Sequence, residues 1–243
     1  MTIFTEQKFK TLLFALFLML ANTLFAQVEV SHKSGWFYIP ADDTLYIKGS
    51  LSSLQGNDDP LLNLGKMYIS DSVNCYGNNK VFGDIPDTIT GQVYLDGNVK
   101  QILGGDKNLR FGNVFVQNTF DTVTIKTQVE IYGKLQLNSG NVYIPDFKSL
   151  DFLITGRLVG ETNSKRVHGN NYSVMHLNRP LINGETYTNL GGFGLDISIN
   201  GNLGANTHLW RKNIQQVNVS NGSIDRFYTF SPENNGLISN PNI

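Results

Sequence analysis

Hydrophobic and polar residues alternate with a period of two along much of this chain. The clearest stretch is residues 122–144, in which six aliphatic residues fall on every second position: Val123, Ile125, Val129, Ile131, Leu135 and Leu137. Strict alternation is typical of a β-strand with one buried face and one solvated face. The phase slips at Asn138, Ser139 and Gly140, and Val142 and Ile144 resume it on even numbers. The pattern predicts strands that turn a corner at residues 138–140.

A five-residue pattern of aliphatic, any, Gly, any, aliphatic recurs along the chain. Its copies begin at Ile47, Leu95, Ile131, Ile154 and Ile199. A glycine inside a strand supplies no side chain, so it marks a bend, a bulge or the close approach of another backbone segment. The recurrence suggests coils stacked on coils, while the irregular spacing also fits chance copies in a Gly-rich β protein.

The same patterns divide the chain. Alternation continues on even positions over residues 150–158, and no window after residue 26 has the three-to-four spacing of an amphipathic helix. We therefore predict an all-β protein, with a parallel β-helix (β-solenoid) over residues 27–160. Residues 161–171, ETNSKRVHGNN, are polar and predict a linker. Short strands between turn clusters over residues 172–243 predict a β-sandwich segment, whose open edge suggests that it is incomplete.

Residues 1–26 have the pattern of a secretory signal peptide. Lys8 and Lys10 precede an apolar run over residues 11–25, which ends at Ala26. This run has about 15 residues, whereas an uncleaved anchor helix needs roughly 20 to span a bilayer. Cleavage after Ala26 is the prediction, and the chain has no later apolar run long enough to span a membrane as a helix.

Composition excludes several classes of protein. After removal of residues 1–26 the chain is near charge balance and slightly acidic, so it has no basic field to hold nucleic acid. Cys75 is the only cysteine, which excludes an intrachain disulfide. Because the sequence offers no histidine partner for a catalytic thiol, Cys75 is interpreted as a small buried apolar residue.

Several ordered phrases resemble a known group of proteins. The first phrases are residues 91–118 and 129–144, and residues 101–104 of the first phrase, Gln-Ile-Leu-Gly, are expected to form a turn. The later phrases are residues 190–197, 207–211 and 223–232. These phrases resemble the coil repeats and following sandwich segment of large surface proteins secreted by Bacteroidetes-type bacteria. The resemblance implies export by the general pathway and, for many relatives, passage of the outer membrane by the type IX system. That route needs a C-terminal sorting domain, and no such domain is seen before Ile243, which suggests a truncated product or fragment.

Four tripeptides, each with Asp before a hydroxyl residue, resemble acceptors for protein O-glycosylation in the same bacteria. The hydroxyl residues are Thr44, Ser72, Thr88 and Thr122. The alternative is that Asp ends a turn and Thr begins a strand, since each residue favours that place on its own account.

Other candidate chemistry has a plainer interpretation. The acidic residues Asp42, Asp43, Asp58, Asp59, Asp84 and Asp87 offer oxygens to calcium, but they lack repeat spacing and are interpreted as solvated turns. Gly104-Gly105-Asp106 has the Gly and Asp residues of a repeated calcium site, but it occurs once. The histidines His32, His168, His176 and His208 are scattered, with no zinc-site spacing.

Two aromatic clusters, around Trp36 and Trp210, could stack on sugar rings, although alternation with aliphatic residues favours a place in the core. No catalytic residue, metal ligand or cofactor is assigned. The leading hypothesis is a non-enzymatic, secreted or cell-surface protein for adhesion or cell-envelope display, with surface glycans or envelope proteins as partners. The alternative is a carbohydrate-binding module or a β-helix polysaccharide-degrading enzyme, which a groove lined by Trp36 or Trp210 with paired carboxylates would favour.

Overall fold

The computed structural model describes residues 28–33, 35, 37–54, 61–77, 91–170, 172–201, 203–204, 206–215, 224–231, 233 and 237–242. The predicted signal peptide over residues 1–26 lies outside these described residues. The chain is about 60% strand and 2% helix, which confirms the all-β prediction.

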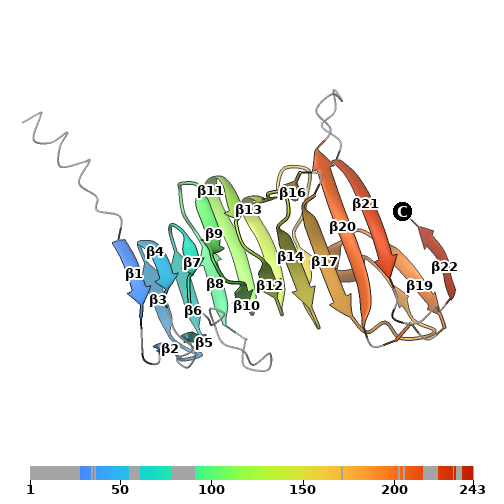
Figure 1. The fold of residues 1–243 in the computed structure, drawn as a ribbon, viewed down its shortest axis with the longest axis horizontal. Coiled ribbons are helices and arrows are strands. Elements are labelled where there is room, and N and C mark those ends of the chain that lie inside the picture. Colours follow the sequence, from blue (N-terminus) through green and yellow to red (C-terminus); the bar gives the residue numbers. More distant parts are fainter. Residues whose placement is uncertain are drawn as a thin grey trace, which may run out of the picture.

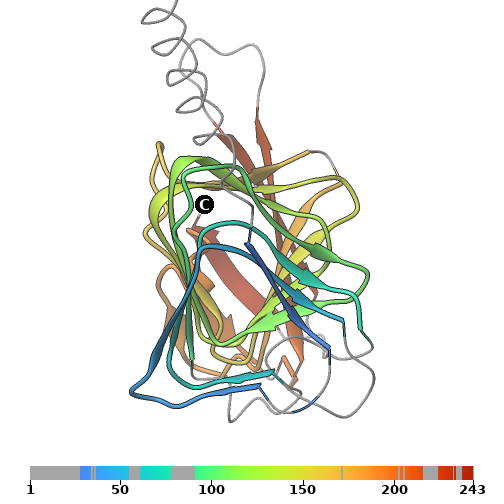
Figure 2. The ribbon, with the colours of Figure 1, turned by 90° about the vertical axis from the view of Figure 1, so that its left-hand side faces the viewer.

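The strands stack into a parallel β-solenoid of about six turns, as the sequence predicted. Figure 1 shows the strands of successive coils side by side along the long axis, and Figure 2 shows the coils superposed when they are viewed from one end. Each complete coil contributes a strand to each of three sides, and every coil pairs in parallel with the next.

Each side is a row of strands in register. The first side holds β1 (Val28–His32), β4 (Gly49–Ser53), β7 (Val73–Cys75), β9 (Gln101–Gly105), the second halves of β11 (Asn113–Ile125) and β13 (Lys134–Ile144), and β16 (Val167–Gly169). The second side holds the pair β2 (Phe37–Ile39) and β5 (Leu61–Asn63), and the row β10 (Leu109–Phe111), β12 (Val129–Ile131), β14 (Ser149–Leu153) and β17 (Val174–Arg179). The third side holds β3 (Thr44–Ile47), β6 (Lys66–Ile69), β8 (Gln92–Leu95), the first halves of β11 and β13, and β15 (Arg157–Val159).

The inward residues of successive coils form aliphatic rows inside the solenoid. One row on the third side joins register partners that are at most 3% exposed: Met67, Val93, Val114, Leu135 and Leu158. Burial of each such side chain contributes roughly 1.5–3 kcal/mol relative to its exposure to water. The alternating residues of 123–137 are inward as predicted, and Cys75 is fully buried.

The predicted corner at residues 138–140 is present within β13. This long strand passes from the third side to the first, and Gly140 has a φ of 75° there. The alternation predicted over residues 150–158 breaks at Ile154, which is 56% exposed with a φ of 55°. Ile154 lies at the corner between β14 and β15, where the side chain points away from the core. The prediction of an even-numbered buried row was therefore wrong for this residue.

Glycine recurs at the corner that leads into the third side, at Gly65, Gly91, Gly112, Gly133 and Gly156. A Cβ atom at Gly91 would lie 2.0 Å from the carbonyl oxygen of Asn63, and one at Gly156 would lie 2.3 Å from that of Ile131. The preceding coil approaches too closely for any side chain. The predicted five-residue pattern is therefore not one repeat, because Gly133 and Gly156 occupy this corner whereas Gly49 and Gly97 occupy the corner between the third and first sides.

An aromatic ladder runs along the outside of the third side. Tyr46, Tyr68, Tyr94 and Phe115 are register partners in successive coils, and their ring centroids are 4.8, 4.4 and 4.5 Å apart. The ammonium of Lys134 lies 4.7 Å from the Phe115 ring centroid and ends the ladder with a cation–π contact. The ladder therefore ties one coil to the next on the solvent side as well.

The coils continue beyond residue 160. Strand β16 lies inside the predicted linker and pairs in parallel with β13, and β17 pairs in parallel with β14. The polar character of this stretch comes from its exposed turn and from Glu161, whose charge is paired within the fold. The wider division of the chain into domains stays a prediction.

Antiparallel strands follow the last coil. Strand β20 (Thr207–Gln215) lies antiparallel to β17, and β21 (Ile224–Ser231) lies antiparallel to β20. A second set contains β18 (Thr186–Tyr187), β19 (Asp196–Asn200) and β22 (Leu237–Asn242), with the short 3₁₀ helix η2 (Leu190–Gly192) between β18 and β19. Phe193, Leu195 and Leu203 join the same continuous core as the coils. This region covers the end of the solenoid, and the predicted partial sandwich stays a prediction.

Candidate functional site

A column of polar and aromatic side chains crosses the outer face of the second side. Register pairing places Arg110, Glu130, Asp151, His176 and Trp210 on adjacent strands of β10, β12, β14, β17 and β20. The first three residues are only 5–6% exposed, so their charges need partners. Arg110 Nε donates a 2.9 Å hydrogen bond to Glu130 Oε2.

Asp151 links this column to the histidines. The amide of Gln128 and the hydroxyl of Ser149 donate hydrogen bonds to Asp151 Oδ2. The other carboxylate oxygen, Oδ1, lies 3.5 Å from His176 Nδ1. The carboxylate therefore orients the His176 ring.

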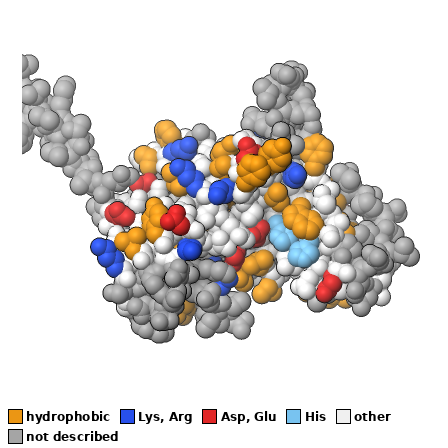
Figure 3. Space-filling model, in the orientation of Figure 1, with side chains coloured by type: hydrophobic (Ala, Val, Ile, Leu, Met, Phe, Trp, Pro, Cys, Tyr) orange, Lys and Arg blue, Asp and Glu red, His pale blue; other side chains and the backbone are white. Residues whose placement is uncertain are grey.

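His176, His208 and Trp210 form a near-parallel group of rings on the outer face of β17 and β20. Their ring centroids lie 5.1–5.4 Å apart and their planes differ by 11–18°. Figure 3 shows histidine side chains at the surface beside hydrophobic ones in this part of the molecule. We call His176, His208 and Trp210 the ring platform.

The two histidines are also hydrogen-bonded to each other. His176 Nε2 lies 2.9 Å from His208 Nδ1. A neutral His176 that directs its Nδ1 proton toward Asp151 accepts this bond from His208. Burial lowers the pKa of His208, and the nearby His176 lowers it further, while Glu233 opposes the change. The pair is therefore biased against carrying two positive charges.

The ring platform offers a flat apolar surface with polar edges, which is the kind of surface that stacks on a sugar ring.

Glycoside hydrolysis uses two carboxylates, which flank the scissile bond from both sides. Here Asp151 is held by three neighbouring side chains, and Glu130 is committed to Arg110. Among the described residues, no group of three or more His, Cys, Asp or Glu could hold a metal ion.

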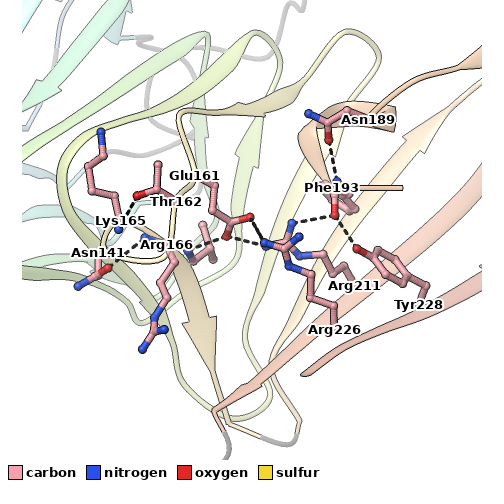
Figure 4. A network of polar contacts seen from close by, with 12 residues as sticks. Asn141, Glu161, Thr162, Lys165, Arg166, Asn189, Phe193, Arg211, Arg226 and Tyr228 are labelled. Atoms are coloured by element: carbon pink, nitrogen blue, oxygen red, sulfur yellow. Dashed lines mark hydrogen bonds and ion pairs between the residues drawn. The ribbon is translucent and has the colours of Figure 1, made fainter. Parts of the chain in front are cut away.

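A second polar cluster joins the last coil to the antiparallel strands (Figure 4). Arg211 of β20 is fully buried, and its Nη2 donates to both oxygens of Glu161 at 2.6 and 2.7 Å. Arg211 Nη1 and the Tyr228 hydroxyl both donate to the carbonyl oxygen of Phe193. Burial lowers the pKa of Arg211, and the charge of Glu161 opposes that change. A salt bridge at this place fastens β20 and β21 to the solenoid.

The predicted glycosylation residues lie in different surroundings. Thr44 is exposed at the start of β3, after the turn over residues 40–43. Ser72 is half-buried and its hydroxyl donates to Asp71, and Thr122 is half-buried inside β11. Thr88 lies outside the described residues. Glycosylation of these residues stays a prediction, and only Thr44 among the three described residues has an exposed side chain.

The other candidate residues from the sequence lie in different surroundings or outside the described residues. Asp42 and Asp43 are exposed turn residues, as the plainer interpretation predicted. Asp58, Asp59, Asp84, Asp87 and Trp36 lie outside the described residues. The preference for a core position was wrong for Trp210, whose side chain is half-buried on the ring platform, on the outer face.

Sequence reasoning missed the ring platform and the Glu161–Arg211 pair. His176 and His208 are 32 residues apart, and Glu161 and Arg211 are 50 apart. Their proximity depends on β20 returning antiparallel to β17, which periodicity does not specify. The one available signal was local, since His208 and Trp210 share a strand face two residues apart.

No protein-family model, curated protein or solved structure matches the chain. In the part of the chain that the structure describes, no helix has the length and apolar character needed to cross a membrane. The geometry defines the molecule as a β-solenoid covered at one end by antiparallel strands.

Proposed function

We propose that this chain is an exported, non-enzymatic surface or structural protein that serves adhesion or cell-envelope display. The observation that supports the proposal is the stack of about six parallel coils on one continuous core. With about 4.8 Å between neighbouring strands, such a stack extends roughly 30 Å and presents three long faces. Repeating coils of this kind provide reach and extended binding surfaces.

The proposed address follows from the sequence. The pattern of residues 1–26 favours export by the general pathway, and the resemblance to Bacteroidetes-type surface proteins favours the type IX route for crossing the outer membrane. Surface glycans or cell-envelope proteins are the proposed partners.

Expression of the full tagged chain in a Bacteroidetes-type host tests this proposal. We expect the mature protein to begin at Gln27 by mass spectrometry and to be recovered outside the cytoplasm. Leu18→Arg should block export because it places a charge in the apolar run. Leu54→Arg, the same change at an exposed residue, should leave export unchanged. Retention of residues 1–26 on an intracellular protein would contradict the proposal.

Adhesion needs its own measurement. Beads coated with the purified chain should be retained on cell-envelope preparations or glycan surfaces more than beads coated with an unrelated protein of similar charge. Equal retention would argue against an adhesive role, and cell-envelope display would then be the remaining proposed role.

Carbohydrate binding is a second candidate, and the ring platform is the specific observation that favours it. Titration of polysaccharides should change tryptophan fluorescence in the wild type and in Trp36→Phe, but not in Trp210→Phe. Release of reducing ends during the same incubation would instead indicate the enzymatic alternative. No fluorescence change with any polysaccharide would remove the ring platform as a sugar site.

A further inference from the structure

A pocket lies where the last coil meets the antiparallel strands. Its cavity volume is about 440 Å³, within the range of small-ligand sites. The lining consists of residues 157–161, Thr188, Asn189, Gly192, Gly194 and Arg226 of β21. This pocket is distinct from the ring platform, and no residue is shared between the two.

Positive charge exceeds negative charge around the pocket. Arg157 and Arg226 line it, and Arg211 lies behind them against Glu161. Arg179 is close enough that Arg157 lowers its pKa, although burial is the larger cause of that shift. Glu161 is the one carboxylate among the lining residues, and Asp196 accepts a hydrogen bond from the backbone of the lining residue Asn189. The lining itself therefore carries two guanidinium groups and one carboxylate, an excess of one positive charge on a chain whose net charge is −1.

Glu161 is shared between Arg211 and the lining residue Arg226. Its oxygens accept two short bonds from Arg211 and one from the backbone N–H of Val167. Arg226 reaches Glu161 only at 3.4 Å, and its side chain is 41% exposed. Figure 4 shows Glu161 directed at Arg211, with Arg226 alongside.

Arg157 makes fewer polar contacts than Arg226. Within the residues that the structure describes, its guanidinium makes no hydrogen bond or ion pair, and its charge lowers the pKa of Arg179. Arg179 lies outside the lining; its Nε is buried without a hydrogen-bond partner among the described residues, while its Nη2 donates to the carbonyl oxygen of Gly156. Arg157 and Arg226 line the same cavity, and two guanidinium groups at one cavity favour an anion as a partner.

We propose that this pocket binds an acidic sugar, through a carboxylate or sulfate group held by Arg157 and Arg226. Guanidinium groups match the planar, bidentate geometry of oxyanions better than ammonium groups do. The remaining lining combines the polar Thr188 with the apolar Val159, which suits the hydroxyl groups and C–H faces of a sugar ring. The inference concerns the pocket alone and holds whether or not the chain is displayed on a cell.

Calorimetric titration of the purified chain tests the proposal. The ligands are glucuronate, glucose 6-sulfate, neutral glucose and inorganic sulfate. At least one of the two acidic sugars should bind, glucose should bind at least tenfold more weakly, and affinity should fall as salt rises. Whichever acidic sugar binds more tightly identifies the preferred oxyanion.

Variants distinguish the pocket from general surface charge. Arg157→Gln and Arg226→Gln should each weaken binding about tenfold or more, because each removes a charge-assisted hydrogen bond. Arg166→Gln is the matched control, since Arg166 lies outside the pocket lining and should bind like the wild type. Thermal melts of all three variants check that each is folded.

Three results would overturn the inference. The first is binding of neither acidic sugar above the level of glucose. The second is equal binding of inorganic sulfate and glucose 6-sulfate, which would mean that the pocket makes no use of the sugar ring. The third is an equal effect of the pocket variants and Arg166→Gln in folded proteins.

Discussion

Arg211 is the residue on which the attachment of the antiparallel strands most depends. Its guanidinium is fully buried and its charge is balanced by Glu161, whose side chain is 9% exposed. Removal of one partner from a buried ion pair leaves a charge without compensation, which typically costs about 3–5 kcal/mol. Loss of either partner therefore weakens the attachment of β20 to the last coil.

We predict that Glu161→Gln lowers the free energy of unfolding by about 3 kcal/mol in urea denaturation. Arg226→Gln, which removes a long and half-exposed contact to the same carboxylate, should cost under about 1 kcal/mol. Equal losses in the two variants would show that Arg211 is not held by Glu161 as described.

His208 predicts a dependence of stability on pH. Its pKa is lowered in the folded state from the ordinary value of 6.5, first by burial and then by His176. Below pH 6.5 the unfolded chain therefore binds more protons at this residue than the folded chain does, and stability falls as the pH falls toward the folded pKa.

Unfolding free energies measured between pH 5 and pH 8 test the direction of this dependence of stability on pH. The wild type should lose more stability on acidification than His208→Gln, because the variant lacks the titrating group. A steeper loss in His208→Gln would mean that the folded state favours the protonated ring.

At the scale of the elements, the corner glycines set how closely two coils approach. A Cβ at Gly156 would lie 2.3 Å from a backbone carbonyl oxygen, which cannot move without moving its coil. A Cβ at Gly104 would instead have side-chain atoms of Asn74 and Ile102 as its nearest neighbours, each 3.2 Å away. Neither glycine has a positive φ, so the comparison isolates crowding.

Gly156→Ala should therefore destabilise the chain by about 2–3 kcal/mol, and Gly104→Ala by clearly less. Thermal and urea unfolding of the two variants measure the difference. An unchanged Gly156→Ala would mean that the two coils lie further apart at this corner.

The aromatic ladder connects coils through side chains. Tyr68 stacks on both Tyr46 and Tyr94, whereas Tyr46 stacks on Tyr68 and is 66% exposed. Each aromatic pair contributes about 0.5–1.5 kcal/mol beyond its burial.

Tyr68→Ala should cost about 2 kcal/mol of unfolding free energy and Tyr46→Ala about half as much. A double-mutant cycle on the two tyrosines should give a coupling energy of about 1 kcal/mol. A coupling energy near zero would show that the two rings do not stack in solution.

For the whole molecule, the end of the stack matters as much as its length. Parallel coils leave unpaired backbone groups at each end, and such edges invite pairing with another chain. Strand β20 covers β17 of the last coil, and Phe193 packs against Phe152 of β14 with centroids 5.5 Å apart. The antiparallel strands thus finish the core that the coils begin.

Sequence patterns predicted the strands and their inward residues, because a period of two follows directly from strand geometry. They predicted the corner near Gly140 for the same reason. They did not predict which strands pair, since pairing depends on contacts between residues far apart in the chain. For that reason the ring platform, the Glu161–Arg211 pair and the continuation of the coils through β16 and β17 appeared only in the structure.

Nuclear Overhauser effects between backbone protons test the parallel stack most directly. The structure predicts contacts between the strands that hold Val93, Val114 and Leu135, which are register partners in three successive coils. These contacts should continue in step, from Tyr94 to Phe115 and from Leu95 to Val116. Contacts of opposite direction, in which residues 129–131 pair with residues 134–137 across a hairpin, would contradict a solenoid.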